Sequence, residues 1–363
     1  MNTNNIPSPT AAGRVAVVIL NWNGADMLRR FLPSVVANTP AGLADIIVAD
    51  NASTDDSLTV LADFPGVKLI TLDRNHGFAG GYQVALAKLG DGYAYYLLLN
   101  SDVMTPPGWL QPMTDYLRHH PDVAACQPKL MAEHDHASFE YAGAAGGYID
   151  ALGYPFCRGR VFDVVEHDSG QYDDVADVFW ATGAALLIRS RAYWDAGGLD
   201  SRFFAHQEEI DLCWRLRARG HRIVCVPASV VYHVGGGTLP KENPRKTFLN
   251  FRNNLLLLYK NLPARRLRRV MFVRCWLDAL ASLVFLLKGE GGSFMAVWRA
   301  RRAFRSMRAD FAASRAENMA AAVTDSIPEM LPASLLVEFH LRRHRLFSQI
   351  SRAWNGLGHP RPS

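Results

Sequence analysis

Residues 96–103 read YLLLNSDV, an apolar run that ends in Asn100, Ser101 and Asp102. The apolar part predicts a strand that is buried on both faces. Three shorter runs nearer the N-terminus also favour strands, and amphipathic segments separate them. This alternation predicts a mostly parallel sheet with helices on both faces. The expected strands are 15–20, 45–50, 67–73 and 93–100, and the helical segments between them are 25–38, 55–64 and 77–90.

Polar residues and glycines follow each of the four expected strands. Because ligands bind at the carboxyl ends of the strands in open α/β sheets, we expect these residues to share one binding edge. The glycines let the backbone approach a ligand closely. No G-x-G-x-x-G pattern follows the first strand, which argues against a dinucleotide-dependent dehydrogenase. The strand-end residues are Asn21, Asn23, Asp50, Asn51, Arg74, Gly77, Asn100, Ser101 and Asp102.

Asp102 has two interpretations. A carboxylate at a strand end, beside polar Asn100, suits Mg²⁺ or Mn²⁺, and such an ion would hold and neutralise a diphosphate. The other interpretation is an ordinary turn, because N-S-D before T-P-P is good turn chemistry. Taken alone, the tripeptide favours the turn. His233 ends a later expected strand before three glycines, and it is either a structural residue or a second metal ligand.

Three carboxylates lie together where a loop enters a predicted helix over 209–220: Glu208, Glu209 and Asp211. They either stabilise the helix through the positive end of its dipole or include a general base that deprotonates a hydroxyl. Clustered carboxylates raise one another's pKa, which helps a base near neutral pH. A segment that precedes another expected strand offers acceptor-side residues, although it also resembles plain core. Those residues are Trp180, Thr182 and Gly183.

The composition describes a globular chain of 363 residues with a net charge of +5 and five scattered cysteines. The cysteines form no C-x-x-C pair, which argues against a disulfide framework and indicates a reducing compartment. Residues 1–13 have no apolar stretch, so we expect a disordered tail and no secretory signal. These features predict a cytoplasmic protein.

Residues 263–363 differ in character, because they are basic and rich in aromatic residues. The segment 267–287 predicts a helix with a wide apolar face that Arg274 and Asp278 interrupt. A spanning helix needs about 20 apolar residues, so an in-plane helix on an anionic membrane fits better. The alternative is that these helices pack on the rest of the chain or on another subunit. The apolar face favours lipid over nucleic acid as the anionic partner.

Seven segments in order resemble family 2 glycosyltransferases with the GT-A fold, of the rhamnosyltransferase-like type. The resemblance covers Val15–Asn261, so we expect a GT-A domain over 14–262 followed by a membrane-associating helical extension. The segments are VVILNWNG, VADNASTDDS, RNHGFAGGY, LLLNSDV, ATGAALLIRS, GGLDSRFFAHQEEIDLCWRLRARG and VYHVGGGT.

The resemblance implies roles for several of these residues. It implies that Asp50 and Arg74 contact the nucleotide base, that Asp102 and His233 hold a divalent metal at the diphosphate, and that Glu209 is the base. Glu208 and Asp211 remain alternative bases. Two departures stand out: Asn100 replaces the first acid of the D-x-D motif, and Glu replaces Asp at the base position.

The implied reaction is an inverting displacement that moves a sugar from a nucleoside diphosphate to a hydroxyl. The resemblance favours dTDP-rhamnose as donor, a glycan or lipid-linked acceptor of the cell envelope, and a peripheral location on the cytoplasmic face of the inner membrane. Self-association stays open. The main alternative is an inactive scaffold that binds a sugar nucleotide or a membrane. A nucleotidyltransferase would need a basic Gly-rich loop after the first strand, and N-W-N-G supplies none.

Overall fold

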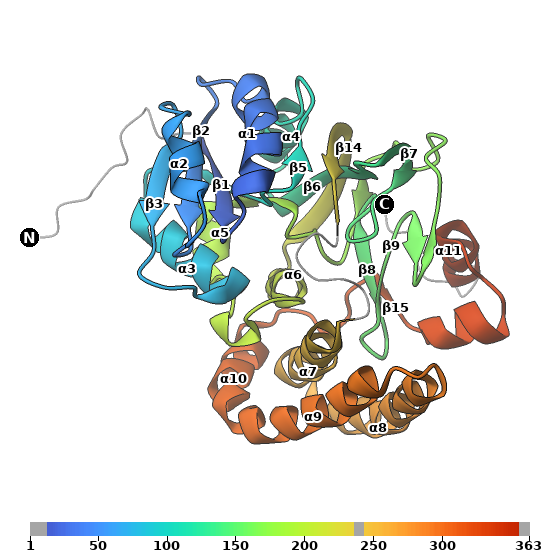
Figure 1. The fold of residues 1–363 in the computed structure, drawn as a ribbon. Helices are drawn as coiled ribbons and strands as arrows, with labels where there is room; N and C mark the ends of the chain where they lie inside the picture. Colours follow the sequence, from blue (N-terminus) through green and yellow to red (C-terminus); the bar gives the residue numbers. More distant parts are fainter. Residues whose placement is uncertain (1–12, 236–242, 356–363) are drawn as a thin grey trace, which may run out of the picture.

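Figure 1 shows the computed structural model of the chain, which describes residues 13–235 and 243–355. Most of the predicted tail therefore lies outside the described residues. A ten-stranded mixed sheet forms the centre, in the order β12-β14-β6-β13-β4-β1-β2-β3, with β5 on β14 and β7 on β6. Its first half is the predicted parallel sheet, made of β1 (Val15–Asn21), β2 (Ala44–Asp50), β3 (Lys68–Thr71) and β4 (Tyr95–Leu99).

The central strand β1 explains why the sheet is covered on both sides. Val15, Val17 and Ile19 belong to one buried cluster, whereas Ala16 and Val18 belong to the other. Successive side chains of a strand point to opposite faces, so a run that is apolar at every position needs two cores. Helices supply them: α1 (Ala25–Asn38), α2 (Ser57–Ala62), α3 (Gly77–Leu89), α4 (Gln111–His119), α5 (Ser190–Asp195) and α6 (Glu208–Ala218).

The second half of the sheet contains antiparallel pairs. Strand β13 lies antiparallel between β4 and β6, and β14 runs parallel to β6. Two mostly apolar runs, 222–226 and 229–233, flank Pro227, yet one strand, β14, passes through both of them. Its register shifts between Val226 and Val230, around Pro227, which has no N–H to donate. The bounds are β5 (Val103–Met104), β6 (Val123–Ala132), β7 (Asp135–Phe139), β12 (Ala176–Asp177), β13 (Ala185–Arg189) and β14 (Arg222–His233).

A second, five-stranded sheet joins the middle of the chain to its C-terminal part. Strand β15 (Met330–Leu331) pairs in parallel with β8 (Gly147–Asp150), and the Leu335 N–H donates to Oδ2 of Asp150 at 2.8 Å. The rings of Tyr148 and Trp354 pack with centroids 6.0 Å apart. The other strands of this sheet are β9 (Pro155–Cys157), β10 (Arg160–Val161) and β11 (Val164–Val165).

The helices after residue 243 form a layer of their own. Figure 1 shows α8, α9 and α10 at the bottom of the molecule, with α7 between them and α6. Of the described residues, only those of α8 form a helix long and apolar enough to cross a membrane, by length and composition alone. The bounds are α7 (Pro244–Asn261), α8 (Ala264–Leu287), α9 (Gly291–Met307), α10 (Ala312–Ala321) and α11 (Phe347–Asn355).

Candidate active site

The loops after β1 and β2 meet through buried side chains. The Asn21 amide donates from Nδ2 to Oδ1 of Asp50 and to Oγ of Ser53, both at 3.1 Å. The backbone N–H of Ser53 donates to Oδ2 of Asp50 at 3.0 Å. Oδ1 of Asn21 is buried and has no hydrogen-bond partner within the described part of the chain. The predicted neighbours Asn21 and Asp50 are therefore in contact, and one amide oxygen there is left unpaired.

Two further asparagines shape the rim of this edge. Asn23 has a left-handed backbone, with φ of 50°, and its Oδ1 accepts from the Thr54 N–H at 2.7 Å. Asn51 accepts from the His76 N–H at 2.9 Å and donates to the carbonyl of Gly77 at 3.1 Å. These bonds fix the loop that carries the exposed side chain of Arg74.

Glycine is required at the start of α3. Gly77 has a φ of +72°, and a Cβ there would lie 2.5 Å from the ring of Phe204. Phe204 belongs to the loop that leads into α6, so the loop after β3 and the loop before Glu208 touch. The Phe204 carbonyl also accepts from the N–H of Phe78 at 2.8 Å.

The D-x-D-like segment lies between these loops. A Cβ on Gly24 would be 2.5 Å from Oδ1 of Asn21 and 3.8 Å from Oγ of Ser101, so the loops after β1 and β4 are neighbours. The N–H of Asn100 donates to the carbonyl of Ala184 at 3.0 Å. Residues 100–102 therefore lie beside the loop after β1 and also contact the residue that follows Gly183.

Asp102 and His233 meet because β5 pairs with β14, which aligns His233 with Val103. Nε2 of His233 lies 3.1 Å from Oδ1 of Asp102, and Nδ1 lies 3.5 Å from Oε1 of Glu140. Burial alone would lower the pKa of His233, but the contacts with Asp102 and Glu140 outweigh burial and raise it to about 10. In turn, the bond from His233 outweighs the burial of Asp102 and lowers the pKa of that carboxyl. A charged imidazolium thus lies between two carboxylates.

This pair fits part of a metal site. A carboxylate oxygen of Asp102 and an imidazole nitrogen of His233 are atoms that a divalent ion such as Mn²⁺ accepts as ligands, and the two side chains are in contact. Among residues 13–235 and 243–355, no group of three or more His, Cys, Asp or Glu side chains could hold a metal ion. Asp102 and His233 would therefore need other oxygen ligands, such as those of a diphosphate, and Nε2 would have to lose its proton.

Glu208 and Glu209 open helix α6 after a strained loop. Phe204, His206 and Gln207 have φ values of 68°, 72° and 70°, which non-glycine residues rarely adopt. Such strain persists only where the surroundings enforce it, and it is common at functional sites. Oε2 of Glu208 and Oε2 of Glu209 are buried with no hydrogen-bond partner among the residues that the structure describes. Both carboxylates are thus ready to accept a proton or a hydrogen bond.

The environment of these two carboxyls favours their neutral forms. Burial raises the pKa of Glu209 to about 7. Burial, followed by the charge of Glu209, raises the pKa of Glu208 well above its ordinary value. A carboxylate whose pKa lies near neutrality has the property that a general base needs.

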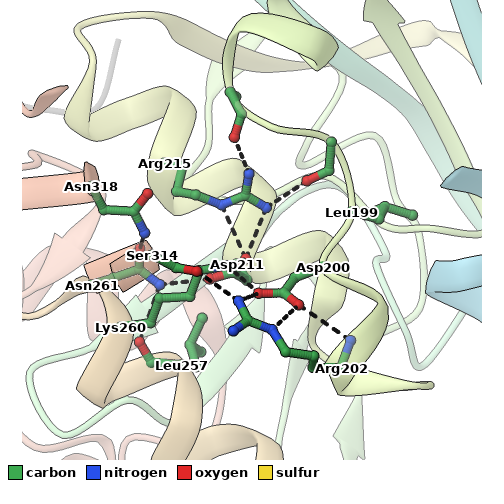
Figure 2. A network of polar contacts seen from close by, with 12 residues as sticks. Leu199, Asp200, Arg202, Asp211, Arg215, Leu257, Lys260, Asn261, Ser314 and Asn318 are labelled. Carbon is green, nitrogen blue, oxygen red and sulfur yellow. Dashed lines mark hydrogen bonds and ion pairs between the residues drawn. The ribbon is translucent and has the colours of Figure 1, made fainter. Parts of the chain in front are cut away.

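Asp211 lies one helical turn further on, in a different environment. Figure 2 shows it inside a buried network, where Oδ2 accepts from Arg215 at 2.8 Å and from Lys260 at 2.7 Å, and Oδ1 accepts from Asn261 at 2.8 Å. Burial alone would raise the pKa of Asp211, but the charges of Arg215 and Lys260 hold it below its ordinary value. Because both oxygens serve this network, we do not retain Asp211 as an alternative base.

The three residues expected on the acceptor side separate into two groups. Trp180 and Thr182 are buried, and they donate to the carbonyls of Tyr148 at 2.9 Å and of Ala142 at 2.7 Å. A Cβ on Gly183 would instead lie 3.8 Å from Cβ of Glu209. The structure therefore brings Gly183 to the carboxylates, whereas Trp180 and Thr182 hold the backbone behind it.

Sequence reasoning missed several polar residues of this region. Glu140 contacts His233 but comes from β7 and the loop after it, where no local pattern marks it. His206 has a buried Nε2 with no hydrogen-bond partner in the described chain, and burial lowers its pKa to about 4. Asn253 and Asn254 of α7 bond the strained loop. For Asn253 and Asn254, the one available sequence signal was a pair of adjacent amides directly before the apolar run 255–258.

Residues 16–142 match the family model described as glycosyl transferase family 2. This part of the chain is similar to glycosyltransferase family 2. The match covers the strands and loops that carry Asn21, Asp50 and Asp102, and it confirms the resemblance seen in the sequence motifs.

The curated proteins to which this chain is similar include rhamnosyltransferases. The chain is 28% identical over 232 residues to the N-acetylglucosaminyl-diphospho-decaprenol L-rhamnosyltransferase of Mycobacterium tuberculosis, covering 60% of this chain and 75% of the relative. It is 24% identical over 226 residues to the rhamnosyltransferase WbbL of Escherichia coli, covering 60% of this chain and 83% of the relative.

Solved structures confirm the GT-A fold. GalNAc-T7, crystallised with UDP, GalNAc and Mn²⁺, superposes with a TM-score of 0.52 at 17% identity, over 68% of this chain and 48% of that one. S. aureus TarS 1-349 superposes with a TM-score of 0.50 at 14% identity, over 92% and 93% of the two chains. At these identities the likeness shows the fold alone.

The buried network in Figure 2 predicts a structural role for Asp211. Asp211→Asn leaves Arg215 buried without its anion and Lys260 with Asp200 alone, so we expect the free energy of unfolding to fall by about 3–5 kcal/mol. Asp195→Ala is the matched control, because its exposed pair with Arg191 on α5 is expected to contribute less than about 0.5 kcal/mol. Urea unfolding at pH 7 measures both. An Asp211→Asn protein that is as stable as the control but inactive would make Asp211 a base after all.

The raised pKa of Glu209 predicts a pH-dependent stability. The native state keeps the proton up to about pH 7, whereas the unfolded state loses it near the ordinary value of 4.5. Stability is therefore lost as the pH rises between these values. We expect Glu209→Gln to raise the Tm by a few degrees at pH 8 and to leave it unchanged near pH 4. Glu317→Gln, at an exposed position, is the control; equal Tm changes for both variants would contradict the assignment.

Proposed function

We propose that this enzyme transfers a sugar from a nucleoside-diphosphate donor to a hydroxyl group, with inversion at the anomeric carbon. The proposal rests on one observation: the loops at this edge of the sheet hold two carboxyl groups in opposite environments. One environment favours the charged form, and the other favours the neutral form. Asp102 is held as a charged carboxylate by His233. Glu209 has a raised pKa and an unpartnered oxygen. The first suits the leaving diphosphate, and the second suits proton removal from an acceptor.

The nucleoside would lie over the loops after β1, β2 and β3. Asp50 and Asn51 are both buried and fixed by hydrogen bonds, so they offer a rigid surface to a base and ribose. The unpaired Oδ1 of Asn21 offers one more acceptor. Asn23, Arg74 and Gly77 form the rim, with Arg74 exposed toward an incoming anion.

The diphosphate would lie at Asn100, Ser101 and Asp102. A Mg²⁺ or Mn²⁺ ion held by Asp102 and His233 would supply positive charge to the departing diphosphate. Crystals of GalNAc-T7 hold Mn²⁺ together with UDP, which supports a divalent metal in this fold. The imidazolium of His233 provides positive charge at this position before the donor binds.

Glu209 would take the acceptor proton. As the O–H bond breaks, the acceptor oxygen forms a bond to the anomeric carbon, and the bond from that carbon to the diphosphate oxygen breaks on the opposite face. Gly183 leaves room beside Glu209 because it has no side chain. Glu208 lies next in the chain with its own unpartnered oxygen, and it is the alternative base.

We further propose rhamnose, carried by dTDP, as the transferred sugar and a lipid-linked glycan as the acceptor. The names of the relatives from Mycobacterium tuberculosis and Escherichia coli support the sugar, and the former names a decaprenol-linked diphosphate as acceptor. Such an acceptor would keep the enzyme on the cytoplasmic face of the inner membrane. The competing function is an inactive scaffold that binds the sugar nucleotide, because Asn100 supplies no second carboxylate.

Two variants test the proposed function. Asp102→Ala should abolish the Mn²⁺-dependent increase in Tm that dTDP gives the wild-type protein, because one of two metal ligands is lost. Glu209→Gln should keep that increase and lower turnover of dTDP-rhamnose with a prenyl-diphosphate-linked glycan about 10²–10⁴-fold. Asp115→Ala, on the exposed face of α4, is the control. Near-normal turnover in Glu209→Gln would move the base to Glu208, and no turnover in the wild-type protein with bound dTDP would favour the scaffold.

A further inference from the structure

Helix α8 turns its charged residues inward and its apolar residues outward. Arg274 and Asp278 are 2% and 0% exposed, whereas Trp276 and Leu287 are 69% and 79% exposed. The sequence pattern had suggested that the two charges interrupt an apolar face. In the structure they lie on the opposite side of the helix, so the outer face stays apolar for its last four turns. That face consists of Phe272, Trp276, Leu280, Leu283 and Leu287.

The inner face of α8 is fixed to the protein. Arg274 donates to Asp278 at 3.2 Å and to the carbonyl of Leu152 at 2.9 Å, and it contacts Asn254 of α7. Arg301 of α9 contacts the other oxygen of Asp278. A helix that crossed a bilayer would have to break these contacts or carry them into hydrocarbon, which is costly for charged groups. An orientation along the membrane surface keeps them.

Arginines surround the apolar face. Arg268 and Arg269 are exposed on the first two turns of α8, ahead of the apolar residues on the same side, whereas Arg265 beside them pairs with Asp325. Helix α9 exposes Trp298 and Met295 together with further arginines. Between residues 264 and 308 the acidic residues are Asp278, which is buried, and Glu290. A second copy of the chain would therefore face arginine with arginine, whereas anionic lipid supplies the missing negative charge.

We propose that α8 and α9 form a docking surface for an anionic lipid bilayer, with α8 in the plane of the membrane. The apolar side chains of α8 would insert below the headgroups, and the arginines would contact lipid phosphates. The inference rests on the proposed function only in naming the bilayer that carries a lipid-linked acceptor. Figure 1 places this layer at one end of the molecule, beyond α7 and α6.

Flotation of the full chain with vesicles tests this surface. Wild-type protein should float with phosphatidylcholine vesicles that contain phosphatidylglycerol and not with phosphatidylcholine alone. The double variant Trp276→Glu with Leu283→Glu should lose flotation, whereas Val323→Glu, at a 75% exposed position elsewhere, should keep it.

Three results would overturn the docking surface: flotation of the double variant, no flotation of the wild-type protein, or a wild-type dimer that the double variant dissociates. The Tm increase with dTDP and Mn²⁺ is measured on the same proteins. Docking can therefore fail while the enzyme assignment stands, and the reverse also holds.

A separate observation concerns the strained loop before Glu208. Asn253 of α7 is completely buried, and its Nδ2 donates to the carbonyls of Phe203, Ala205 and His206 at 3.0, 2.8 and 2.7 Å. Asn254 donates from Nδ2 to Oε1 of Gln207 at 3.0 Å. Of the left-handed residues, His206 is thus bonded to α7 through its carbonyl and Gln207 through its side chain, whereas the Phe204 carbonyl accepts from the Phe78 N–H of α3.

We infer that Asn253 is a positioning residue, which holds the loop so that Glu208 and Glu209 face the acceptor. The inference rests on the proposed function, because it assumes that one of these carboxylates is the base. Without the amide, the carbonyls of Ala205 and His206 lose this donor, whereas that of Phe203 still accepts from Arg252 at 2.7 Å. The loop can then relax toward ordinary backbone angles. A displacement of about 1 Å at a reacting group is enough to cost roughly 10²-fold in rate.

Kinetics of the full enzyme test the role of Asn253. Asn253→Ala should lower kcat about 10–100-fold and leave KM for the sugar nucleotide unchanged. Asn253→Ser keeps one donor and should recover part of kcat, so the comparison holds even if the alanine variant folds poorly. Asn243→Ala removes only the cap of the same helix, where Oδ1 accepts from the Arg245 N–H at 2.8 Å, and should keep kcat.

Wild-type kcat in a folded Asn253→Ser protein would overturn the inference, and so would a parallel loss of kcat and sugar-nucleotide binding. An inactive Glu209→Gln beside a fully active Asn253→Ala would reject the positioning role and keep the proposed function. An active Glu209→Gln would reject the assigned base instead.

Discussion

The antiparallel pairing of β5 with β14 is the contact on which the site depends. It is only two residues long, yet it places His233 beside the carboxylate that follows β4. Without it, Asp102 would end an ordinary turn. Strand β14 also lies beside β6, whose partner strand β7 leads to Glu140. His233, which lies between Asp102 and Glu140, therefore connects the loop that follows the parallel strand β4 to the mixed part of the sheet.

Much of the first half of the fold can be predicted because its causes are local. The alternation of strand and helix is visible in each short run, and β1 needs a core on both faces because residues 15–20 are all apolar. The second sheet could not be predicted. Its edge strand β15 pairs with β8 from far along the chain, and Asp150 is satisfied by Leu335, which no local pattern indicates. The continuity of β14 through Pro227 likewise depends on its neighbours.

The same division explains what the sequence revealed about the site. Strand-end residues such as Asn21 and Asp50 were predictable, because parallel strands deliver their carboxyl ends to one edge. The separation of Glu209 from Asp211 was not, although they are two residues apart. Lys260 and Arg215 decide it, since they draw Asp211 into a buried network. Similarly, the sequence showed that α8 contains Arg274 and Asp278, but it did not show that both lie on the buried side of the helix.

The order of the site residues along the chain has an evolutionary consequence. Apart from His233, the residues proposed for the nucleotide sugar lie before β5 and fall within the segment that matches the family model. The proposed base, its supporting helix α7 and the outward-facing helices come later. Recognition of the two substrates is thus nearly separable, so one substrate specificity can diverge while the other is retained. Any such divergence would have to preserve the pairing of β5 with β14, because this pairing places His233 beside Asp102.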